Sequence, residues 1–176
     1  MVTNEIRERA KRVKLLIMDC DGVLTDGRIV LLSETEETKF FDARDGHGIR
    51  MAARAGLRTA IISGRTSFAV RTRARDLGIH HLVEGSLIKI DPYLKILSEE
   101  KLEDADVCYI GDDVTDIPLM RRAGLAVAVA DATVDTKNHA HLITELGGGR
   151  GAVRELIELI LNVQGKWQQV MARYLE

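Results

Sequence analysis

The sequence has few aromatic residues (4%), only two prolines, only two cysteines and no long apolar run. Its longest apolar runs, 15–18 and 125–130, are far shorter than the roughly 20 residues that cross a bilayer, so no membrane helix is expected. The first twelve residues are charged and lack the apolar core of a signal peptide. Cys20 and Cys108 lie in or beside apolar runs and are expected to be reduced core residues rather than a disulfide. These absences favour a cytoplasmic location.

The chain also lacks an excess of charge of either sign. Its formal net charge is −2, and acidic and basic residues are interspersed, which argues against binding to nucleic acid or to an anionic membrane. An anionic ligand must therefore be held by local contacts. The pairs His80 and His81, and His139 and His141, have no third ligand at a metal-binding spacing, so no histidine metal site is predicted.

The length of 176 residues, 45% of them hydrophobic, suits one sizeable core, so we expect a single domain over residues 1–176. Short apolar runs alternate with stretches that carry apolar residues at helical spacing. This rhythm predicts an α/β protein with a Rossmann-like parallel sheet flanked by helices. The expected strands are 14–18, 58–62, 105–110, 125–129 and 141–144, and the expected helices are 46–55, 67–77, 89–100, 113–123 and 151–162. Pro118 indicates that its helix starts late or is distorted.

Two segments depart from this rhythm. The β-prone runs 28–32 and 38–41 are separated by the polar stretch 33–37, which predicts a projecting β-hairpin at about 27–41. A tail, about 163–176, carries Trp167 and Tyr174. Two interpretations of the tail stay open: it continues the last helix and packs on its own chain, or it helps to close the site of a neighbouring subunit.

Two carboxylates follow the first predicted strand directly. Asp19 and Asp21 are two residues apart, ahead of Gly22, and ligands bind at the carboxyl ends of strands in open α/β sheets. One carboxylate can attack phosphorus while the other exchanges protons with the leaving group and with water. The alternative is that this pair belongs to a turn or a helix cap.

A second predicted strand ends at Ser63, Gly64 and Arg65. The Ser63 hydroxyl and the following amides suit an anion at a strand-to-helix turn, and Arg65 can add a bidentate contact, although Ser63 also suits a plain helix cap. Further on, Lys89 lies at the start of a predicted helix. There it can neutralise a nucleophile and a phosphate, or be an ordinary surface lysine.

The strand predicted at 105–110 leads into a cluster of three acids, Asp112, Asp113 and Asp116. Mg²⁺ prefers carboxylate oxygens and bridges to phosphate, so it would let several carboxylates and a phosphate share one site. Without a cation, mutual repulsion would raise their pKa values. An N-capping Asp113 and a solvated Asp116 would explain two of these acids but not Asp112.

Together these elements resemble the four motifs of the phosphatases of the haloacid dehalogenase superfamily. The matching positions are Asp19-x-Asp21-Gly22-Val23, Ser63-Gly64-Arg65, Lys89 and Gly111-Asp112-Asp113-x-x-Asp116. The segments 21–27, 44–49 and 147–155 further resemble one branch, the 3-deoxy-D-manno-octulosonate 8-phosphate (KDO 8-phosphate) phosphatases. The resemblance covers about residues 13–162. Ile88 stands where the family often has Asp, which leaves the exact substrate open.

The resemblance implies roles for the motif residues. Asp19 would be the nucleophile that becomes phosphorylated, and Asp21 the acid and base. Asp19, Asp112 and the backbone carbonyl of Asp21 would hold Mg²⁺, while Ser63 and Lys89 would bind the phosphoryl group. Candidate contacts to the sugar-acid phosphate substrate are Arg44, His47, Gly64, Arg65 and Arg150, the last as an anion clamp after three glycines.

The resemblance also implies an assembly. The gaps between motifs leave no room for a cap domain, and a site without a cap stays wet unless a partner covers it. Relatives are tetramers whose hairpins associate, so a homotetramer is expected. The implied function is hydrolysis of KDO 8-phosphate to KDO and phosphate in lipopolysaccharide biosynthesis.

Three alternatives remain beside that function. The substrate could be another ulosonate phosphate, such as a nonulosonate 9-phosphate. Sugar phosphomutases of the same superfamily need a cap that retains the intermediate, and none fits here. A non-catalytic oligomerisation module belongs to a different class of protein, and the presence of both Asp19 and Asp21 argues against it.

Overall fold

The structure, a computed structural model, describes residues 2–33 and 37–175. Its centre is a sheet of six parallel strands in the order β5-β4-β1-β6-β7-β8. The strands are β1 Leu15–Met18, β4 Arg58–Ile62, β5 His81–Val83, β6 Val107–Gly111, β7 Leu125–Ala128 and β8 Leu142–Ile143. Because β1 and β6 are neighbours near the middle, their side chains are wholly buried. The predicted Rossmann-like α/β class is confirmed.

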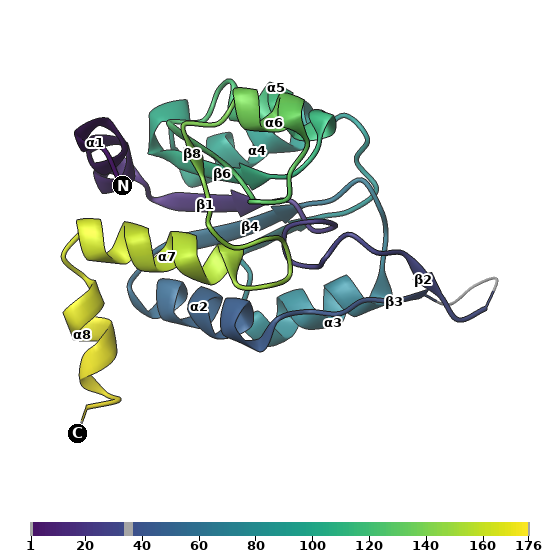
Figure 1. Cartoon of the computed structure of the whole chain (residues 1–176), viewed down its shortest axis with the longest axis horizontal. Helices are drawn as coiled ribbons and strands as arrows, with labels where there is room; N and C mark the ends of the chain where they lie inside the picture. The colour runs from purple at the N-terminus through teal and green to yellow at the C-terminus, as the bar shows by residue number, and fades with distance from the viewer. Residues whose placement is uncertain (1, 34–36, 176) are drawn as a thin grey trace.

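Helices cover both faces of the sheet (Figure 1). One face carries α2 Ala43–Arg54, α3 Phe68–Leu77 and α7 Ala152–Val163. The other carries α4 Ile90–Glu100, α5 Ile117–Met120 and α6 Val134–Asn138. The layers bury one continuous apolar core in which Tyr93 and Tyr109 are the largest fully buried side chains.

Helix α1, Asn4–Arg12, was not predicted from the sequence. Thr3 caps it by accepting a hydrogen bond from the amide of Ile6, and it buries only Ile6 and Ala10. With only two buried positions and six charged residues, this helix has too few apolar residues to mark it clearly as a helix that packs on the core.

The helix predicted over 113–123 is broken in the structure. A 3₁₀ turn, Val114–Asp116, precedes the four-residue helix α5, and short 3₁₀ turns Asp104–Asp106 and Val114–Asp116 each begin with a capping box. Pro118 lies in the first turn of α5, where its missing amide hydrogen removes no helical bond. The late start that Pro118 indicated is confirmed, whereas the length predicted for this helix was wrong.

The hairpin projects at the end of the molecule toward which the strands point (Figure 1). Its strands, β2 Val30–Leu31 and β3 Glu37–Thr38, are antiparallel and much shorter than the predicted runs. Residues 34–36 of the predicted loop lie outside the described residues. Between Asp19 and Ser63 the chain builds only this hairpin, α2 and β4, and between Ser63 and Lys89 only α3 and β5, so the expected lack of a cap holds for the described part.

The tail forms a separate helix, α8 Trp167–Ala172, at the opposite end from the hairpin (Figure 1). Gly165 has φ +69°, a left-handed conformation that ends the path of α7, so the tail does not continue the last helix. Trp167 packs on its own chain, with the guanidinium carbon of Arg154 5.7 Å from its ring centre. No helix within 2–33 or 37–175 is long and apolar enough to cross a membrane.

Candidate active site

Strand β1 delivers Asp19 to the carboxyl edge of the sheet. The Asp19 amide donates to the carbonyl of Ile110 on β6, so the residue is held in register beyond the last β1 pair. A tight turn follows, in which the amides of Val23, Leu24 and Thr25 all converge on the carbonyl of Cys20. Gly22 has φ +94°, and a Cβ there would overlap the Asp112 carboxylate. A glycine is therefore required where this turn meets the next motif.

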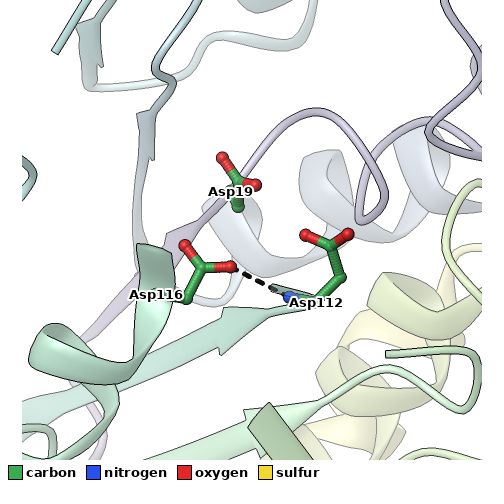
Figure 2. Close-up of side chains that lie close together, drawn as sticks. All are labelled: Asp19, Asp112 and Asp116. Atoms are coloured by element: carbon green, nitrogen blue, oxygen red, sulfur yellow. Dashed lines mark hydrogen bonds between the residues drawn. The ribbon is translucent and has the colours of Figure 1, made fainter. Parts of the chain in front are cut away.

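Strand β6 delivers Asp112 beside Asp19, and the turn after it buries Asp116. Oδ2 of Asp116 accepts hydrogen bonds from the amides of Asp112 (2.9 Å) and Asp113 (3.3 Å), and Oδ1 accepts from the Tyr109 hydroxyl (2.6 Å). Figure 2 shows Asp19, Asp112 and Asp116 converging, and one oxygen of each lies within 4.8 Å of the others. The buried side chains of Tyr109 and Asp116 thus fix the conformation of the turn at residues 112–116.

Lys89 bridges two of these acids. Its Nζ lies 2.8 Å from Oδ1 of Asp19 and 2.7 Å from Oδ1 of Asp116, and its side chain is buried at the start of α4. Burial lowers its pKa, but the carboxylates of Asp19 and Asp116 outweigh this and raise the pKa above its ordinary value. Lys89 is therefore a cation, and the surface-lysine alternative does not describe it.

Burial and the neighbouring acids raise the pKa values of Asp19 and Asp112, as expected without a cation. Burial, together with the charge of Asp116, raises the pKa of Asp19 to about 6 despite the opposing effect of Lys89. Burial and the neighbouring Asp19 and Asp116 raise the pKa of Asp112 to about 8. Negative charge at this edge of the sheet is thus only partly neutralised by the protein itself.

The acidic side chains of Asp19, Asp21 and Asp112 line a cavity of about 290 Å³. Asp19, Asp21, Lys89 and Asp112 line it from the first, third and fourth motifs, and Gly64 and Arg65 line it from the second. Ser63 is buried beside Gly64 and is not one of the residues that line the cavity; its hydroxyl accepts a hydrogen bond from the Arg65 amide (3.2 Å). The cavity is small, polar and at the strand ends, which suits a phosphate more than a large apolar ligand.

A larger hollow, of about 690 Å³, lies between the end of α1 and the end of α7. It is lined by Lys11, Arg12, Lys14 and Lys166 with Asp106. These cations stand near helix carboxyl ends, where they complement the helix dipoles, and the only acid is already paired with Lys14 at 3.1 Å. The hollow therefore holds one carboxylate, Asp106, with no second acid among the described residues that line it.

Three of the predicted substrate contacts lie outside the cavity. Arg44 is exposed and bonded to Asp42 and to the carbonyl of Arg150, and the Arg150 guanidinium lies 3.8 Å from Asp26. His47 instead lies 2.9 Å from the Tyr174 hydroxyl. Within one chain the structure does not bring these three residues to the cavity that Gly64 and Arg65 line.

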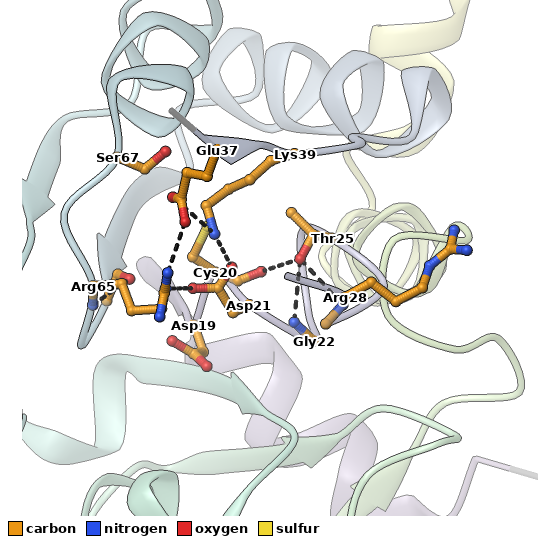
Figure 3. Close-up of polar contacts among 12 residues, drawn as sticks. Asp19, Cys20, Asp21, Gly22, Thr25, Arg28, Glu37, Lys39, Arg65 and Ser67 are labelled. Carbon is orange, nitrogen blue, oxygen red and sulfur yellow. Dashed lines mark hydrogen bonds and ion pairs between the residues drawn. The ribbon is translucent and has the colours of Figure 1, made fainter. Parts of the chain in front are cut away.

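Sequence reasoning missed Lys39 and Glu37 of the hairpin. Lys39 donates a hydrogen bond to Oδ1 of Asp21, and Glu37 accepts one from Arg65 at 2.7 Å (Figure 3). No motif pointed to them, because a lysine and a glutamate on a predicted polar hairpin are ordinary surface residues. Only the folding of the hairpin over the first motif could reveal them.

The carboxylate oxygens of Asp19 and Asp112 are suitable ligands for a hard cation. Oδ1 of Asp112 is buried and accepts no hydrogen bond from the described residues, so it has a free lone pair beside the Asp19 carboxylate. Carboxylate oxygens are the ligands that Mg²⁺ prefers. Asp116 belongs to the same cluster, but its oxygens are already used by Lys89, Tyr109 and two amides.

Comparison with known proteins agrees with these motifs. The family of haloacid dehalogenase-like hydrolases matches residues 79–153. The KDO 8-phosphate phosphatase of Yersinia pestis is 44% identical over 165 residues, which are 94% of this chain and 88% of the relative.

Two solved structures are also similar. The crystal structure of a probable YrbI family phosphatase from Pseudomonas syringae has a TM-score of 0.96 and 45% identity, with 99% of each chain covered. That of the KDO 8-phosphate phosphatase of Moraxella catarrhalis, in complex with magnesium, phosphate and KDO, has a TM-score of 0.95 and 39% identity, with 98% of this chain and 99% of that chain covered. This chain therefore belongs to the haloacid dehalogenase-like hydrolases, in the family of the KDO 8-phosphate phosphatases, and is a phosphatase.

Proposed function

We propose that this chain hydrolyses KDO 8-phosphate to KDO and phosphate through a phosphorylated Asp19, with Mg²⁺ as cofactor. The observation that carries the proposal is the contact of Asp19 with the buried Lys89 (2.8 Å) beside the free oxygen of Asp112, in a small polar cavity. The similar proteins named for this activity, one of them in complex with KDO, support the choice of substrate.

In the first step, an oxygen of Asp19 forms a bond to phosphorus while the bond from phosphorus to the sugar oxygen breaks. Asp21 gives its proton to that sugar oxygen, so the sugar acid leaves as an alcohol. Lys89 keeps Asp19 oriented and holds positive charge where the phosphoryl oxygens must pass. Gly64 and Arg65, which line the cavity, would bind those oxygens through their amides, together with the Ser63 hydroxyl.

In the second step, Asp21, now ionised, takes a proton from a water molecule as the water oxygen attacks phosphorus. The bond between Asp19 and phosphorus breaks, and phosphate and a free carboxylate result. One residue therefore serves as acid and then as base, which requires that Asp21 stay in one position through both steps.

Mg²⁺ would be held by the carboxylates of Asp19 and Asp112 and by the backbone carbonyl of Asp21. When bound, it supplies positive charge that stabilises the negative charge of the transferred phosphoryl group. The raised pKa values of Asp19 and Asp112 support this assignment, since two crowded carboxylates gain most from a cation.

We also propose that the chain forms a homotetramer and that Arg44, His47 and Arg150 contact the substrate only across subunits. The hairpin supports this, because Ile29, Leu31 and Phe40 are more than half exposed on it. A partner over the hairpin would bury these side chains and narrow the open cavity. The cytoplasmic location expected from the sequence stays a prediction.

The direct test measures phosphate release with Mg²⁺ from KDO 8-phosphate, a nonulosonate 9-phosphate and p-nitrophenyl phosphate. We expect the highest kcat/KM with KDO 8-phosphate, and loss of activity in excess chelator. Asp19→Asn should lower kcat by at least about a thousandfold at unchanged thermal stability, because an amide fills the same space but is a poor nucleophile. No phosphate release from any sugar-acid phosphate, or normal rates in Asp19→Asn, would refute the proposal.

A further inference from the structure

The side chain of Lys39 is a buried cation on a hairpin whose apolar residues Ile29, Leu31 and Phe40 are exposed. Lys39 follows β3, and its side chain is only 3% exposed, whereas the next residue, Phe40, is 59% exposed. A buried ammonium group is tolerated when it is paired and hydrogen-bonded. The partners of Lys39 therefore explain why the chain buries it.

Lys39, Asp21, Arg65 and Glu37 form a closed ring in which basic and acidic side chains alternate (Figure 3). Lys39 donates a hydrogen bond to Oδ1 of Asp21 and lies 3.5 Å from Oε1 of Glu37. Arg65 donates to Oε2 of Glu37 at 2.7 Å, and its Nε lies 4.0 Å from Oδ2 of Asp21. At 4.0 Å the Arg65 contact is too long for a hydrogen bond, so Lys39 is the cation that orients Asp21.

The two oxygens of Asp21 consequently differ. Oδ1 is held by Lys39, whereas Oδ2 lies on the side of Arg65, which lines the cavity together with Asp21. Rotation about the last bond of an aspartate is soft, so a carboxylate without an anchor would sample many orientations. A proton donor must lie within hydrogen-bond reach of the leaving oxygen to act.

We propose that Lys39 is a positioning residue for proton transfer: it anchors one oxygen of Asp21 so that the other faces the leaving oxygen of the substrate. The proposal rests on the function proposed above, in which Asp21 is the acid and base. Since Lys39 belongs to the hairpin, the same contact couples the position of the hairpin to the orientation of Asp21.

The test exploits leaving groups of different basicity. p-Nitrophenolate departs without a proton, whereas the sugar oxygen of KDO 8-phosphate needs one. We would measure leaving-group release in single turnovers, with enzyme in excess over each substrate, for wild type and Lys39→Met. We expect Lys39→Met to lose about tenfold or more in rate with KDO 8-phosphate and less than about threefold with p-nitrophenyl phosphate. Equal losses with both substrates would overturn the proposal.

Two further variants separate positioning from a merely structural effect. Glu37→Gln leaves the contact between Lys39 and Asp21 in place. Its rate losses with KDO 8-phosphate and with p-nitrophenyl phosphate should therefore differ less than those of Lys39→Met; this difference is the leaving-group dependence of a variant. The double variant Asp21→Asn/Lys39→Met should be no slower than Asp21→Asn alone, because Lys39 acts only through Asp21. Additive losses would contradict the proposal.

The failure of this inference is distinguishable from failure of the proposed function. If Asp21→Asn itself shows no leaving-group dependence, the acid role of Asp21 is wrong. If Asp21→Asn shows it and Lys39→Met does not, only the role of Lys39 is wrong. Should Lys39→Met lower the melting temperature strongly, Lys39→Leu, which likewise lacks a hydrogen-bond donor, replaces it in the same comparison.

Discussion

Asp112 and Asp116 belong to one motif, yet their surroundings suit them to different tasks. Asp116 is 0% exposed and bonded to Lys89, Tyr109 and two backbone amides. Asp112 has a buried oxygen that no described residue satisfies. A carboxylate with all its bonds made organises a turn, while one with a free lone pair can bind a cation.

We therefore predict that Asp112→Asn weakens Mg²⁺ binding by at least about tenfold, because it removes a charged ligand. Asp116→Asn should affect Mg²⁺ less and instead lower the melting temperature, since it leaves Lys89 and Tyr109 with a poorer partner. Titration calorimetry with Mg²⁺ and thermal unfolding check the two effects. Equal Mg²⁺ affinity in wild type and Asp112→Asn would exclude Asp112 as a ligand.

At the scale of elements, the glycine run before α7 is a packed junction. The Gly149 amide donates to the carbonyl of Val23 (2.8 Å), and the Gly148 amide donates to Asp131 (2.9 Å). A Cβ on Gly148 would overlap the carbonyl oxygen of Gly22. The three glycines before Arg150, which was expected to be an anion clamp, thus support the turn that follows Asp19 and Asp21.

Gly148→Ala should push the turn at Gly22 away from its position and lower kcat by about a hundredfold, since small displacements of reacting groups have large effects on rate. Gly56→Ala is the matched control: Gly56 has φ +78° but no atom near its Cβ position. That control should destabilise the fold by about 1 kcal/mol and leave kcat unchanged. Steady-state kinetics and thermal unfolding of both variants provide the measurements, and normal activity in Gly148→Ala would count against the support role.

Asp45 joins α2 to the start of α7. It is buried and accepts hydrogen bonds from the amides of Gly151 (3.2 Å) and Arg154 (2.8 Å). Burial raises its pKa from 3.8 to about 6, in spite of those hydrogen bonds. Since the folded pKa is the higher one, the stabilisation from Asp45 is fully present below about pH 4 and is lost as pH rises through about 6.

The predicted result is that the stability of wild type relative to Asp45→Asn falls between pH 4 and pH 7, by up to about 3 kcal/mol. Asp42→Asn is the control, because Arg44 lowers the pKa of Asp42 and the trend should reverse in sign. Urea unfolding at several pH values measures both. A pH-independent difference for Asp45→Asn would show that this carboxyl titrates normally in the folded protein.

At the scale of the whole molecule, the hairpin and the tail lie at opposite ends (Figure 1). The tail of one chain therefore cannot cover the cavity beside its own hairpin, and any closing role must act on a neighbour. Val170 is buried and Trp167 packs on the core, so α8 also supports its own subunit. Whether the tail closes a neighbouring site stays a prediction.

Leu31→Lys should dissociate the proposed tetramer, because Leu31 is 69% exposed on the hairpin and a charge buried at an interface is unfavourable. Val134→Lys is the control: Val134 is similarly exposed (74%) but lies on α6 rather than on the hairpin, so this variant should leave the assembly intact. Sedimentation velocity distinguishes the species. If Leu31→Lys forms the same oligomer as wild type, or if wild type is a monomer, the hairpin is not the subunit interface.

The sequence by itself determined the fold class and several of the residues that line the cavity. Apolar runs such as 15–18 and 58–62 are local signals of buried strands, and acids or small polar residues directly after them must meet at one edge of a parallel sheet. That reasoning located Asp19, Asp21 and Asp112 without any structure. It could not rank Asp112 against Asp116, because the two differ only in their partners.

Only the tertiary structure decided which residues from other elements reach this edge. Lys39 approaches Asp21 because the hairpin folds back over the first motif, and Arg44, His47 and Arg150 stay away because α2 and the glycine junction point them elsewhere. Such contacts join positions far apart in the chain, and no local periodicity records them. Burial and charge pairing, which define the role of Lys39, exist only once those distant segments have packed together.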